Sequence, residues 1–514
     1  MASSDCYKLL NSLKKLYSVP QLRRIDSAAA GQTGCSGTAL MERAGAAAFA
    51  MLRRLWPTAQ RLAVLCGPGN NGGDGYVLAR LAHLAGFRVQ LVALAGLPRA
   101  GSEADVARQW FGASGGTQQR DWQAALGGAE LCVDALLGTG ADRPLDGPIA
   151  AAVAGLNAQT APVLALDVPS GLNADSGQVM GVAVRASATL TFVARKLGLY
   201  TGAARECCGQ LDFDDLGVPA QVVAMAGEAA AVRLDLSSLR SAFLAPRPRH
   251  AHKGSCGHVL VLGGDHGYGG AVRLAGEAAA RTGAGLTSVA TRSQHVAALI
   301  AGRPELMAHG INSATDIAPL LARASVVAVG PGLGQDDFGR DLFAAALASG
   351  LPLVVDADAL NLLARDRQLP RRDDWILTPH PGEAARLLGG TASQIEADRY
   401  GAARALHARF GGVVVLKGAG TVVYDGVSPP GVVPYGNPGM ATGGMGDVLT
   451  GVIAALWAQG LPAAAAAALG ACLHAVAADQ VVARQGERGL LASDLLPALP
   501  ALVNGRNDGA DLGA

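Results

Sequence analysis

The stretch that decides the fold runs from Asn437 to Asp447, NPGMATGGMGD, and continues into the apolar run VLTGVIAALW at residues 448–457. Four of the eight residues between Gly439 and Gly446 are glycines, which lets backbone N–H groups turn toward a bound anion. The apolar run predicts a helix, whose N-terminus adds partial positive charge at the same place. We therefore expect a phosphate-binding loop at the head of a helix.

Asp447 closes this loop. A carboxylate beside phosphate is electrostatically unfavourable unless it takes part in the chemistry, and the natural task is to accept a proton from a substrate hydroxyl. The alternative is a glycine-rich loop in which Asp447 is only the N-cap of the helix.

Length and composition indicate the broad class. A chain of 514 residues exceeds one hydrophobic core, so we expect two domains. Half of the residues are apolar, and the 69 glycines show no collagen-like period, which is typical of a globular chain rich in tight turns. A formal net charge of +1 gives no electrostatic reason for a nucleic-acid or membrane partner, and we expect neither.

The eight cysteines form no CxxC pair, and we find no signal peptide, so we expect reduced thiols in a cytoplasmic protein. The most apolar tract, residues 461–478, contains His474 and directly follows the helix predicted at 448–457. It therefore predicts a buried helical hairpin rather than a membrane span.

The N-terminal half alternates short apolar strands with helical stretches, which predicts a doubly wound α/β domain with a parallel sheet. We expect helices over the first forty residues, with Leu9, Leu13 and Leu16 at helical spacing, and a loop at 67–75 before a helix at 76–85. The predicted strands are 61–66, 89–94, 131–134, 163–167 and 188–192.

A second α/β series begins at residue 257. From 220 to about 255 the chain looks irregular, with residues 246–252 the clearest linker-like segment, and we divide the chain into domains 1–225 and 226–514. The predicted strands of the second domain are 257–264, 286–290, 326–330, 353–356, 375–378 and 413–417.

Five motifs of the second domain each follow a predicted strand, at the edge where open parallel sheets bind ligands. They are the loop 437–447 together with GPGLG at 330–334, DADALN at 356–361, TPHPGE at 378–383 and KGAGT at 417–421. With these motifs, this half resembles the ribokinase-like, nucleotide-dependent dehydratases that repair hydrated NADH and NADPH. The whole chain resembles the bifunctional NAD(P)H-hydrate repair enzymes, in which an epimerase is fused to an ADP-dependent dehydratase.

The resemblance implies roles for residues of the second domain. Asp447 matches the catalytic aspartate. The residues matching the hydrated-dinucleotide site are Ala271, Gly332, His380, Pro381, Gly382, Glu383, Ala384, Ala385, Arg386 and Asp447. Those matching the ADP site are Lys417, Gly418, Ala419, Gly420, Thr421, Asn437, Pro438, Gly439, Met440, Ala441, Thr442, Gly443, Gly444, Met445 and Gly446.

The residues fit that chemistry. Hydroxide is a poor leaving group and phosphate a good one, so transfer of phosphate to the substrate hydroxyl, with Asp447 as base, prepares the elimination. Other roles stay open. His380 either assists the leaving group or is structural, Lys417 either touches phosphate or lies in solvent, and Asp356 and Asp358 either bind Mg²⁺ with ADP or, for Asp358, cap a helix.

Three motifs of the first domain each follow a strand and can face one cleft: NNGGD at 70–74, VDALLGTG at 133–140 and LDVPSG at 166–171. The resemblance implies that these residues bind the hydrated dinucleotide: Asn70, Asn71, Gly72, Gly73, Asp74, Gly138, Thr139, Gly140, Ala141, Asp142, Arg143, Pro144 and Asp167.

Asn71, Asp134 and Ser170 match the family's potassium ligands, and oxygen ligands with one carboxylate suit a hard monovalent cation. Asp167 is expected to be the general acid and base of epimerisation. The alternative is that Asp134 and Asp167 only cap strand ends by binding turn amides. Lys196 is not included among the site residues.

Two competing functions remain. The second domain can be an ordinary small-molecule kinase of the ribokinase-like type, which would leave a stable phosphoester. The first can be a dinucleotide-binding scaffold without activity, although Asp167 and the intact NNGGD motif argue against it. We expect NAD(P)H hydrate and ADP as ligands and a homo-oligomer as the assembly.

Overall fold

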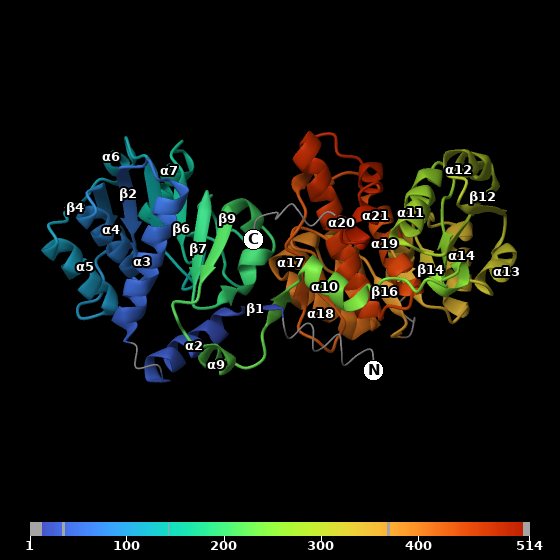
Figure 1. The fold of residues 1–514 in the computed structure, drawn as a ribbon, viewed down its shortest axis with the longest axis horizontal. Helices are drawn as coiled ribbons and strands as arrows, with labels where there is room; N and C mark the ends of the chain where they lie inside the picture. Colours follow the sequence, from blue (N-terminus) through green and yellow to red (C-terminus); the bar gives the residue numbers. More distant parts are fainter. Residues whose placement is uncertain (1–12, 33–35, 142, 367–370, 507–514) are drawn as a thin grey trace. The chain divides into compact units, whose positions relative to one another are not determined.

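The computed structural model describes residues 13–32, 36–141, 143–366 and 371–506. The chain forms two compact α/β units that divide between Ala230 and Ala231 (Figure 1). We call them the N-terminal unit, residues 15–230, and the C-terminal unit, which runs from Ala231 and also includes Leu13 and Lys14.

The N-terminal unit is built on a parallel sheet with the strand order β4-β3-β2-β5-β6-β7-β9, as the alternating pattern predicts. The strands are β2 (Arg61–Cys66), β3 (Arg88–Ala93), β4 (Gln118–Gln119), β5 (Leu131–Ala135), β6 (Val163–Leu166), β7 (Ala188–Phe192) and β9 (Gln210–Asp214). A short parallel pair joins β1 (Lys14–Tyr17) and β8 (Arg195–Lys196).

Alternate residues of the central strands pack toward opposite faces, which is why these strands are apolar throughout. Leu62 and Val64 of β2 pack with α3, α4 and α5, whereas Ala63 and Leu65 pack with α6 and α7. The helices are α2 (Val19–Gln32), α3 (Gly37–Leu55), α4 (Asn70–Leu84), α5 (Glu103–Ala113), α6 (Trp122–Leu126), α7 (Gly147–Asn157), α8 (Ala204–Cys207) and α9 (Ala220–Ala224).

Two local expectations for this unit are wrong. Helix α4 begins at Asn70, not at residue 76, so the NNGGD motif forms its first turn rather than a loop. A Cβ atom on Gly72 would lie 1.9 Å from the Gly67 carbonyl oxygen, so glycine is required here for close approach rather than for a flexible loop. Leu16 lies in strand β1 instead of a helix, and Leu9 lies outside the described residues.

The sheet of the C-terminal unit has the order β13-β12-β11-β14-β15-β16-β17-β18-β19-β10. The expected strands are β11 (His258–Leu262), β12 (Leu286–Arg292), β14 (Val326–Val329), β15 (Leu353–Val355), β16 (Trp375–Leu377) and β17 (Val413–Leu416). Four further strands were not expected: β10 (Ala231–Arg233), β13 (Met307–Ile311), β18 (Val422–Tyr424) and β19 (Gly431–Val432).

The stretch 220–255 is therefore less irregular than expected. It contains α9, strand β10 and helix α10 (Leu236–Phe243), and β10 pairs in parallel with β19 of the C-terminal unit. The other helices are α11 (Gly269–Thr282), α12 (Val296–Gly302), α13 (Ala318–Leu321), α14 (Asp337–Ala348), α15 (Ala357–Arg365), α16 (Pro381–Leu388), α17 (Ala392–Ala397), α18 (Arg399–Phe410), α19 (Met445–Ala458), α20 (Ala463–Gln485) and α21 (Leu499–Val503).

Helices α19 and α20 form the expected hairpin in one large apolar cluster, in which α11 and α19 pack against strands β11, β12 and β14 and α20 packs against β16, β17 and β18. Among the described residues α20 is the one helix long and apolar enough to cross a membrane, but 83% of its most apolar window is buried inside the protein. It is a core helix of the C-terminal unit, which explains its continuous alanine-rich sequence.

Candidate functional sites

The anion loop lies at the head of α19, as the sequence predicts. The N-cap of the helix is Gly444, which has a positive φ of 90° and no side chain to cap the helix. Asp447 lies within the first turn, so the interpretation of Asp447 as the N-cap is wrong. Its carboxylate stands where the helix N-terminus and the loop amides would meet a bound phosphate.

The pKa of Asp447 is raised to about 7. Burial is the main cause, the neighbouring carboxylates of Asp356 and Asp358 add to it, and Lys417 opposes it. A carboxylate with this pKa can both accept and release a proton near neutral pH, which suits a general base.

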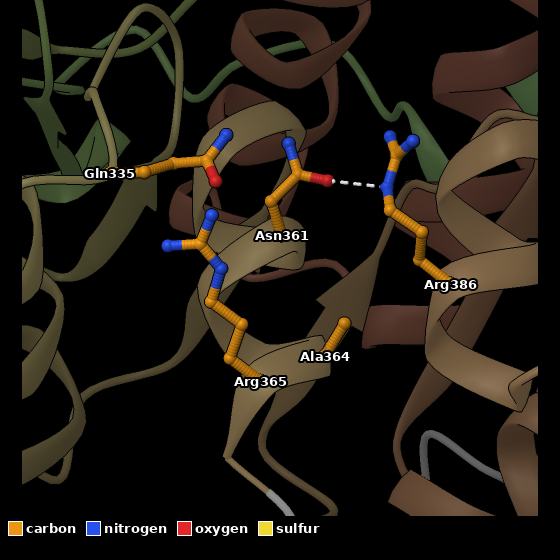
Figure 2. Close-up of a pocket in the computed structure, with 5 residues that line it drawn as sticks. All are labelled: Gln335, Asn361, Ala364, Arg365 and Arg386. Atoms are coloured by element: carbon orange, nitrogen blue, oxygen red, sulfur yellow. Dashed lines mark hydrogen bonds between the residues drawn. The ribbon is translucent and has the colours of Figure 1, made fainter.

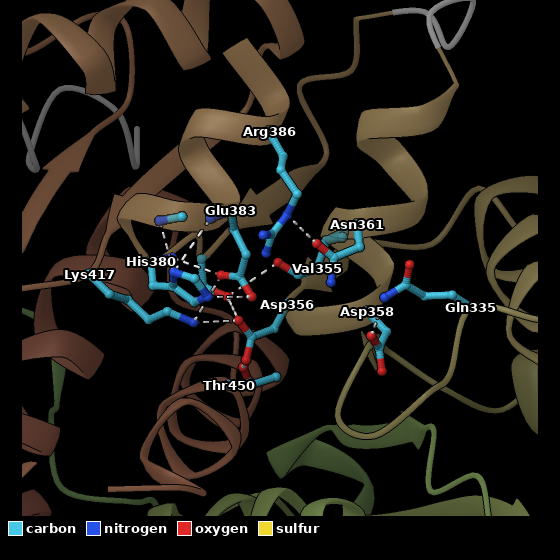
Figure 3. A network of polar contacts seen from close by, with 12 residues as sticks. Gln335, Val355, Asp356, Asp358, Asn361, His380, Glu383, Arg386, Lys417 and Thr450 are labelled. Atoms are coloured by element: carbon cyan, nitrogen blue, oxygen red, sulfur yellow. Dashed lines mark hydrogen bonds and ion pairs between the residues drawn. The ribbon is translucent and has the colours of Figure 1, made fainter. Parts of the chain in front are cut away.

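Asp356 and Lys417 form a buried ion pair beside the loop (Figure 3). Lys417 Nζ lies 2.6 Å from Asp356 Oδ1, and the Lys417 side chain is 19% exposed, so the alternative of a lysine free in solvent is wrong. Burial works against ionisation of Asp356, but Lys417 and its hydrogen bonds hold the Asp356 pKa below its usual value. Thr378 and Thr450 complete the set by donating to the same carboxylate at 2.9 and 3.0 Å.

Lys417 remains a cation. Burial lowers the pKa of its ammonium group, but the carboxylates of Asp356, Glu383 and Asp447 raise it above the usual value overall. A Cβ atom on Gly446 would lie 3.3 Å from Lys417 Nζ, so this positive charge lies directly behind the anion loop. The site therefore combines a fixed cation with the amides that the sequence indicates.

His380 is the N-cap of α16, where its Nδ1 accepts the amides of Gly382 and Glu383 at 3.0 and 3.4 Å. The Glu383 carboxylate in turn accepts the His380 amide at 2.8 Å. These bonds give His380 a structural role. Burial raises the pKa of Glu383 to about 7, with Lys417 opposing the shift.

Asp358 does not cap a helix. It accepts the Gly334 amide and the Gln335 side chain, both at 3.0 Å, and so fastens the GPGLG loop to α15. The oxygens of Asp356 are bound by Lys417 and two threonines, and each oxygen of Asp358 accepts one hydrogen bond.

Some of the residues expected to bind the dinucleotide, Gly332 and Ala271, lie close together. Gly332 has a φ of 54°, and a Cβ atom there would lie 2.5 Å from the Tyr268 Cβ and 3.3 Å from the Ala271 Cβ. The GPGLG loop therefore packs closely on the start of α11. Arg386, on α16, donates to Asn361 Oδ1 at 2.8 Å.

Two residues without any motif hold the expected nucleotide loops. The buried Arg399 of α18 donates to the carbonyls of Leu416 and Lys417 at 3.2 and 3.1 Å. Asp479 of α20 accepts the Gly436 amide at 2.8 Å and the Asn437 side chain at 2.7 Å.

In the N-terminal unit, Asn71, Asp134 and Ser170 surround the backbone of Leu137. Ser170 Oγ donates to Asp134 Oδ1 at 2.6 Å and accepts the Leu137 amide at 2.9 Å, and Asn71 Nδ2 donates to the Leu137 carbonyl at 3.0 Å. Ser170 and Asn71 thus contact the same residue, Leu137, and Ser170 also contacts Asp134.

Asp134 accepts the turn amides of Leu136 and Ser170 at 3.2 and 2.8 Å, so it does cap the strand end. Capping does not account for Asn71, whose Oδ1 is buried and has no hydrogen-bond partner among the described residues. Burial raises the Asp134 pKa to about 6, against the hydrogen bonds from Ser170 and Leu136. A cation beside these oxygens would satisfy Asn71 and favour the ionised form of Asp134.

Asp167 directly follows β6 and has a φ of 63°, an uncommon value for a residue other than glycine. Its Oδ1 forms an ion pair with the buried Lys196, which also donates to the Phe192 carbonyl at 2.6 Å. Lys196, which we did not include among the expected site residues, therefore contacts the residue expected to be the general acid and base.

The neighbouring loops converge on Asp167. A Cβ atom on Gly138 would lie 3.5 Å from both the Asn71 Cβ and Asp167 Oδ2. The pKa of Asp74 is well above its usual value because the group is buried and because Asp167 adds negative charge, with Lys196 opposing. Asn70, Gly140, Arg143 and Pro144 are exposed, and Asp142 lies outside the described residues.

Comparison with known proteins covers both units. Residues 259–501 match the family described as NAD(P)H-hydrate dehydratase, and residues 37–198 match the YjeF-related protein N-terminus. A protein from Streptococcus mutans described as hypothetical is 32% identical with a TM-score of 0.50, over 54% of this chain and 99% of that one. A ribokinase-like superfamily protein from Enterococcus faecalis is 30% identical with the same TM-score, over 54% of this chain and 96% of its own.

Full-length relatives are more similar still. The Bifunctional NAD(P)H-hydrate repair enzyme Nnr of Coxiella burnetii is 48% identical, over 95% of this chain and 99% of its own length. The enzyme of the same name from Escherichia coli is 44% identical, over 94% and 93%. The relatives favour neither a small-molecule kinase nor a scaffold, and the chain belongs to the bifunctional NAD(P)H-hydrate repair enzymes, with an epimerase and a dehydratase unit in one polypeptide.

Proposed function

We propose that the C-terminal unit dehydrates the S form of the hydrate at the expense of ADP, with Asp447 as general base. The observation that carries this is a carboxylate with a pKa of about 7 in the first turn of α19, beside a buried lysine. In this proposal, the other residues expected at the dinucleotide and ADP sites mainly donate backbone hydrogen bonds to the ligands and orient them.

The proposed reaction has two stages. The hydroxyl oxygen on C6 of the hydrated ring attacks the terminal phosphorus of ADP, the bond from that phosphorus to the bridging oxygen breaks to release AMP, and Asp447 takes the hydroxyl proton. The ring nitrogen lone pair then expels phosphate from C6, and loss of a proton from C5 gives NAD(P)H. Loop amides and Lys417 stabilise the negative charge of the transferring group.

The nucleotide is assigned to residues 417–421 and 437–446. We propose that Mg²⁺ binds together with the phosphates of ADP, because the carboxylate oxygens of Asp356 already accept hydrogen bonds from Thr378, Lys417 and Thr450. The preference for ADP rests on the family resemblance.

The test is Asp447→Asn in a single-turnover dehydration assay. Loss of a general base lowers the rate by roughly 10²–10⁴-fold, while epimerisation stays unchanged. Dehydration near the wild-type rate would remove Asp447 from this role.

For the N-terminal unit we propose that Asp167 is the general acid and base of epimerisation: it transfers protons at the hydroxyl or the ring nitrogen while a bond to C6 breaks and re-forms on the opposite face. The observation that carries this is the contact of Asp167 with the buried Lys196, together with the position of Gly138 between Asn71 and the Asp167 carboxylate. Lys196 holds Asp167 in position and supplies the counter-charge.

A potassium site is proposed at Asn71, Asp134 and Ser170, supported by the unpartnered Asn71 oxygen. A bound cation would hold the three loops together and offset negative charge. The test measures the epimerisation rate of wild type and Asp134→Ala in potassium and in a bulky cation at equal ionic strength. We expect potassium alone to raise the wild-type rate and to have no such effect on Asp134→Ala.

We place these reactions in the cytoplasm. The six described cysteines are buried free thiols, which is consistent with a reducing compartment. A homo-oligomer remains our expectation for the assembly.

A further inference from the structure

The C-terminal unit has polar groups beyond the proposed reaction centre. A pocket of about 520 Å³ is lined by Gln335, Asn361, Ala364, Arg365 and Arg386 (Figure 2). Arg386 is among the residues expected to bind the dinucleotide, so this pocket belongs to a site already described. Asp479 of α20 belongs to no expected site, yet it contacts the loop that is expected to bind ADP.

Asp479 and Asn437 form a set of hydrogen bonds at the start of that loop. Asp479 Oδ1 accepts a hydrogen bond from Asn437 Nδ2 at 2.7 Å, and Asp479 Oδ2 accepts one from the Gly436 amide at 2.8 Å. Asn437 Oδ1 in turn accepts the Gly439 amide at 3.1 Å. Both ends of the Asn437 carboxamide are therefore bound inside the protein. We call these three hydrogen bonds the loop clasp.

The backbone around the loop clasp is closely packed. Gly436 has a φ of 103°, and a Cβ atom on Gly439 would lie 2.7 Å from the Glu487 carbonyl oxygen and 2.9 Å from Asn437 Oδ1. The next three residues form a short 3-10 helix of which Asn437 is the N-cap. The direction of the loop amides thus depends on the orientation of the Asn437 side chain, which Asp479 sets.

A simpler explanation is that the loop clasp only stabilises the fold. Asp425 is an aspartate of that simpler kind, because it also accepts two hydrogen bonds from backbone amides, those of Val427 and Ser428, at 3.0 and 2.8 Å. It directly follows β18, which runs antiparallel to β17, and so lies at the sheet edge opposite the loop 417–421. Asp425 is therefore the matched control.

We propose that Asp479 is a positioning residue of the dehydratase reaction, which through the Asn437 side chain holds the loop amides in the arrangement that binds the phosphates of ADP. The inference rests on the proposed function of the C-terminal unit. Asn437 then contributes to ADP binding through the shape of the loop and not through its own carboxamide. Asp479 stays out of contact with the nucleotide, because its oxygens already accept hydrogen bonds and its charge would repel phosphate.

The test exchanges the two side chains. Asp479→Asn leaves one of its two donors without an acceptor, and Asn437→Asp places two carboxylates against each other. Each single variant should therefore raise the Kd and KM for ADP roughly tenfold or more, with kcat largely kept. The double variant, Asp479→Asn with Asn437→Asp, again places a donor against an acceptor and should return both constants to near the wild-type values. Titration calorimetry gives the Kd for ADP without catalysis, and steady-state dehydration gives KM and kcat.

The control Asp425→Asn should lower the free energy of unfolding and leave the Kd and KM for ADP unchanged. The same result for Asp479→Asn would overturn the proposal. A double variant that binds ADP no better than the single variants would also overturn it, because a direct contact between Asn437 and ADP is not restored by a change at residue 479.

The double variant decides the outcome if the single variants do not fold. A Kd for ADP near the wild-type value then supports the proposal, and weak binding or failure to fold overturns it. A wild-type enzyme that binds ADP without dehydrating the hydrate would reject the proposed function, whereas the Kd values would still decide the role of Asp479.

Discussion

Asp447 is held between opposing charges. Burial and the Asp356 carboxylate raise its pKa to about 7, whereas Lys417 lowers it. The form that can accept a proton is thus the minority well below pH 7 and the majority above it, so the ionisation of this one residue sets the pH range of dehydration.

We expect the single-turnover dehydration rate to rise with pH through about 7 and to level off above it, because the ionised Asp447 is the active form. Glu383 also has a pKa raised to about 7, so Glu383→Gln is the control. Asp447→Asn should lose the rising limb, and Glu383→Gln should keep it. If the rising part of the pH profile disappears only in Glu383→Gln, the ionisation belongs to Glu383, and its assignment to Asp447 is contradicted.

At the scale of elements, helix α18 fixes the expected nucleotide loop through Arg399. This side chain is fully buried, and beyond the carbonyls of Leu416 and Lys417 it donates to Glu396 at 3.0 Å. Within the loop, the Thr421 hydroxyl donates to the Gly418 carbonyl at 3.2 Å, and Arg399 ties the start of the loop to α18.

Arg399→Leu should lower the free energy of unfolding by about 3 kcal/mol, since buried carbonyls lose their donor. It should also raise the KM for ADP because the loop relaxes. Arg404→Leu, exposed on the same helix with its guanidinium 5.9 Å from the centroid of the Tyr424 ring, is the control and should change stability by no more than about 1 kcal/mol. Chemical denaturation and ADP titration measure both effects, and equal stability of the two variants would contradict this role for Arg399.

The same elements show what a sequence can and cannot predict. The loops after β2, β5, β6 and β14 to β17 could be placed because parallel strands present their carboxyl ends at one edge. The start of α4 could not, because NNGGD reads as a loop until the close approach at Gly72 is known. Arg399 and Asp479 were missed, and Lys196 was considered but left out of the expected site. Each of these residues belongs to no motif of its own and contacts a loop that is distant in the sequence.

At the scale of the whole molecule, the chain divides between Ala230 and Ala231, upstream of the linker-like stretch at 246–252. Strand β10 pairs with β19, and Leu234, Leu236 and Leu239 belong to the core of the C-terminal unit. The segment 231–243 is therefore part of the dehydratase fold.

We expect a fragment ending at residue 230 to epimerise the hydrate and a fragment beginning at Ala231 to dehydrate its S form. A fragment beginning at Lys253 lacks β10 and α10, so it should be less stable or insoluble. Solubility, thermal unfolding and both activities distinguish the three. Equal stability of the fragments that begin at 231 and 253 would contradict this boundary.

The central claim is that two carboxylates, one in each unit, carry two separate reactions on one substrate. The most direct test follows the recovery of NADH absorbance, with ADP, from purified (R)- and (S)-NADHX separately, using wild type, Asp167→Asn and Asp447→Asn. We expect wild type to convert both forms, Asp167→Asn to convert the S form at the normal rate and the R form only as slowly as it epimerises unaided, and Asp447→Asn to convert neither appreciably. Conversion of the R form by Asp167→Asn at the wild-type rate, or of the S form by Asp447→Asn, would contradict the claim.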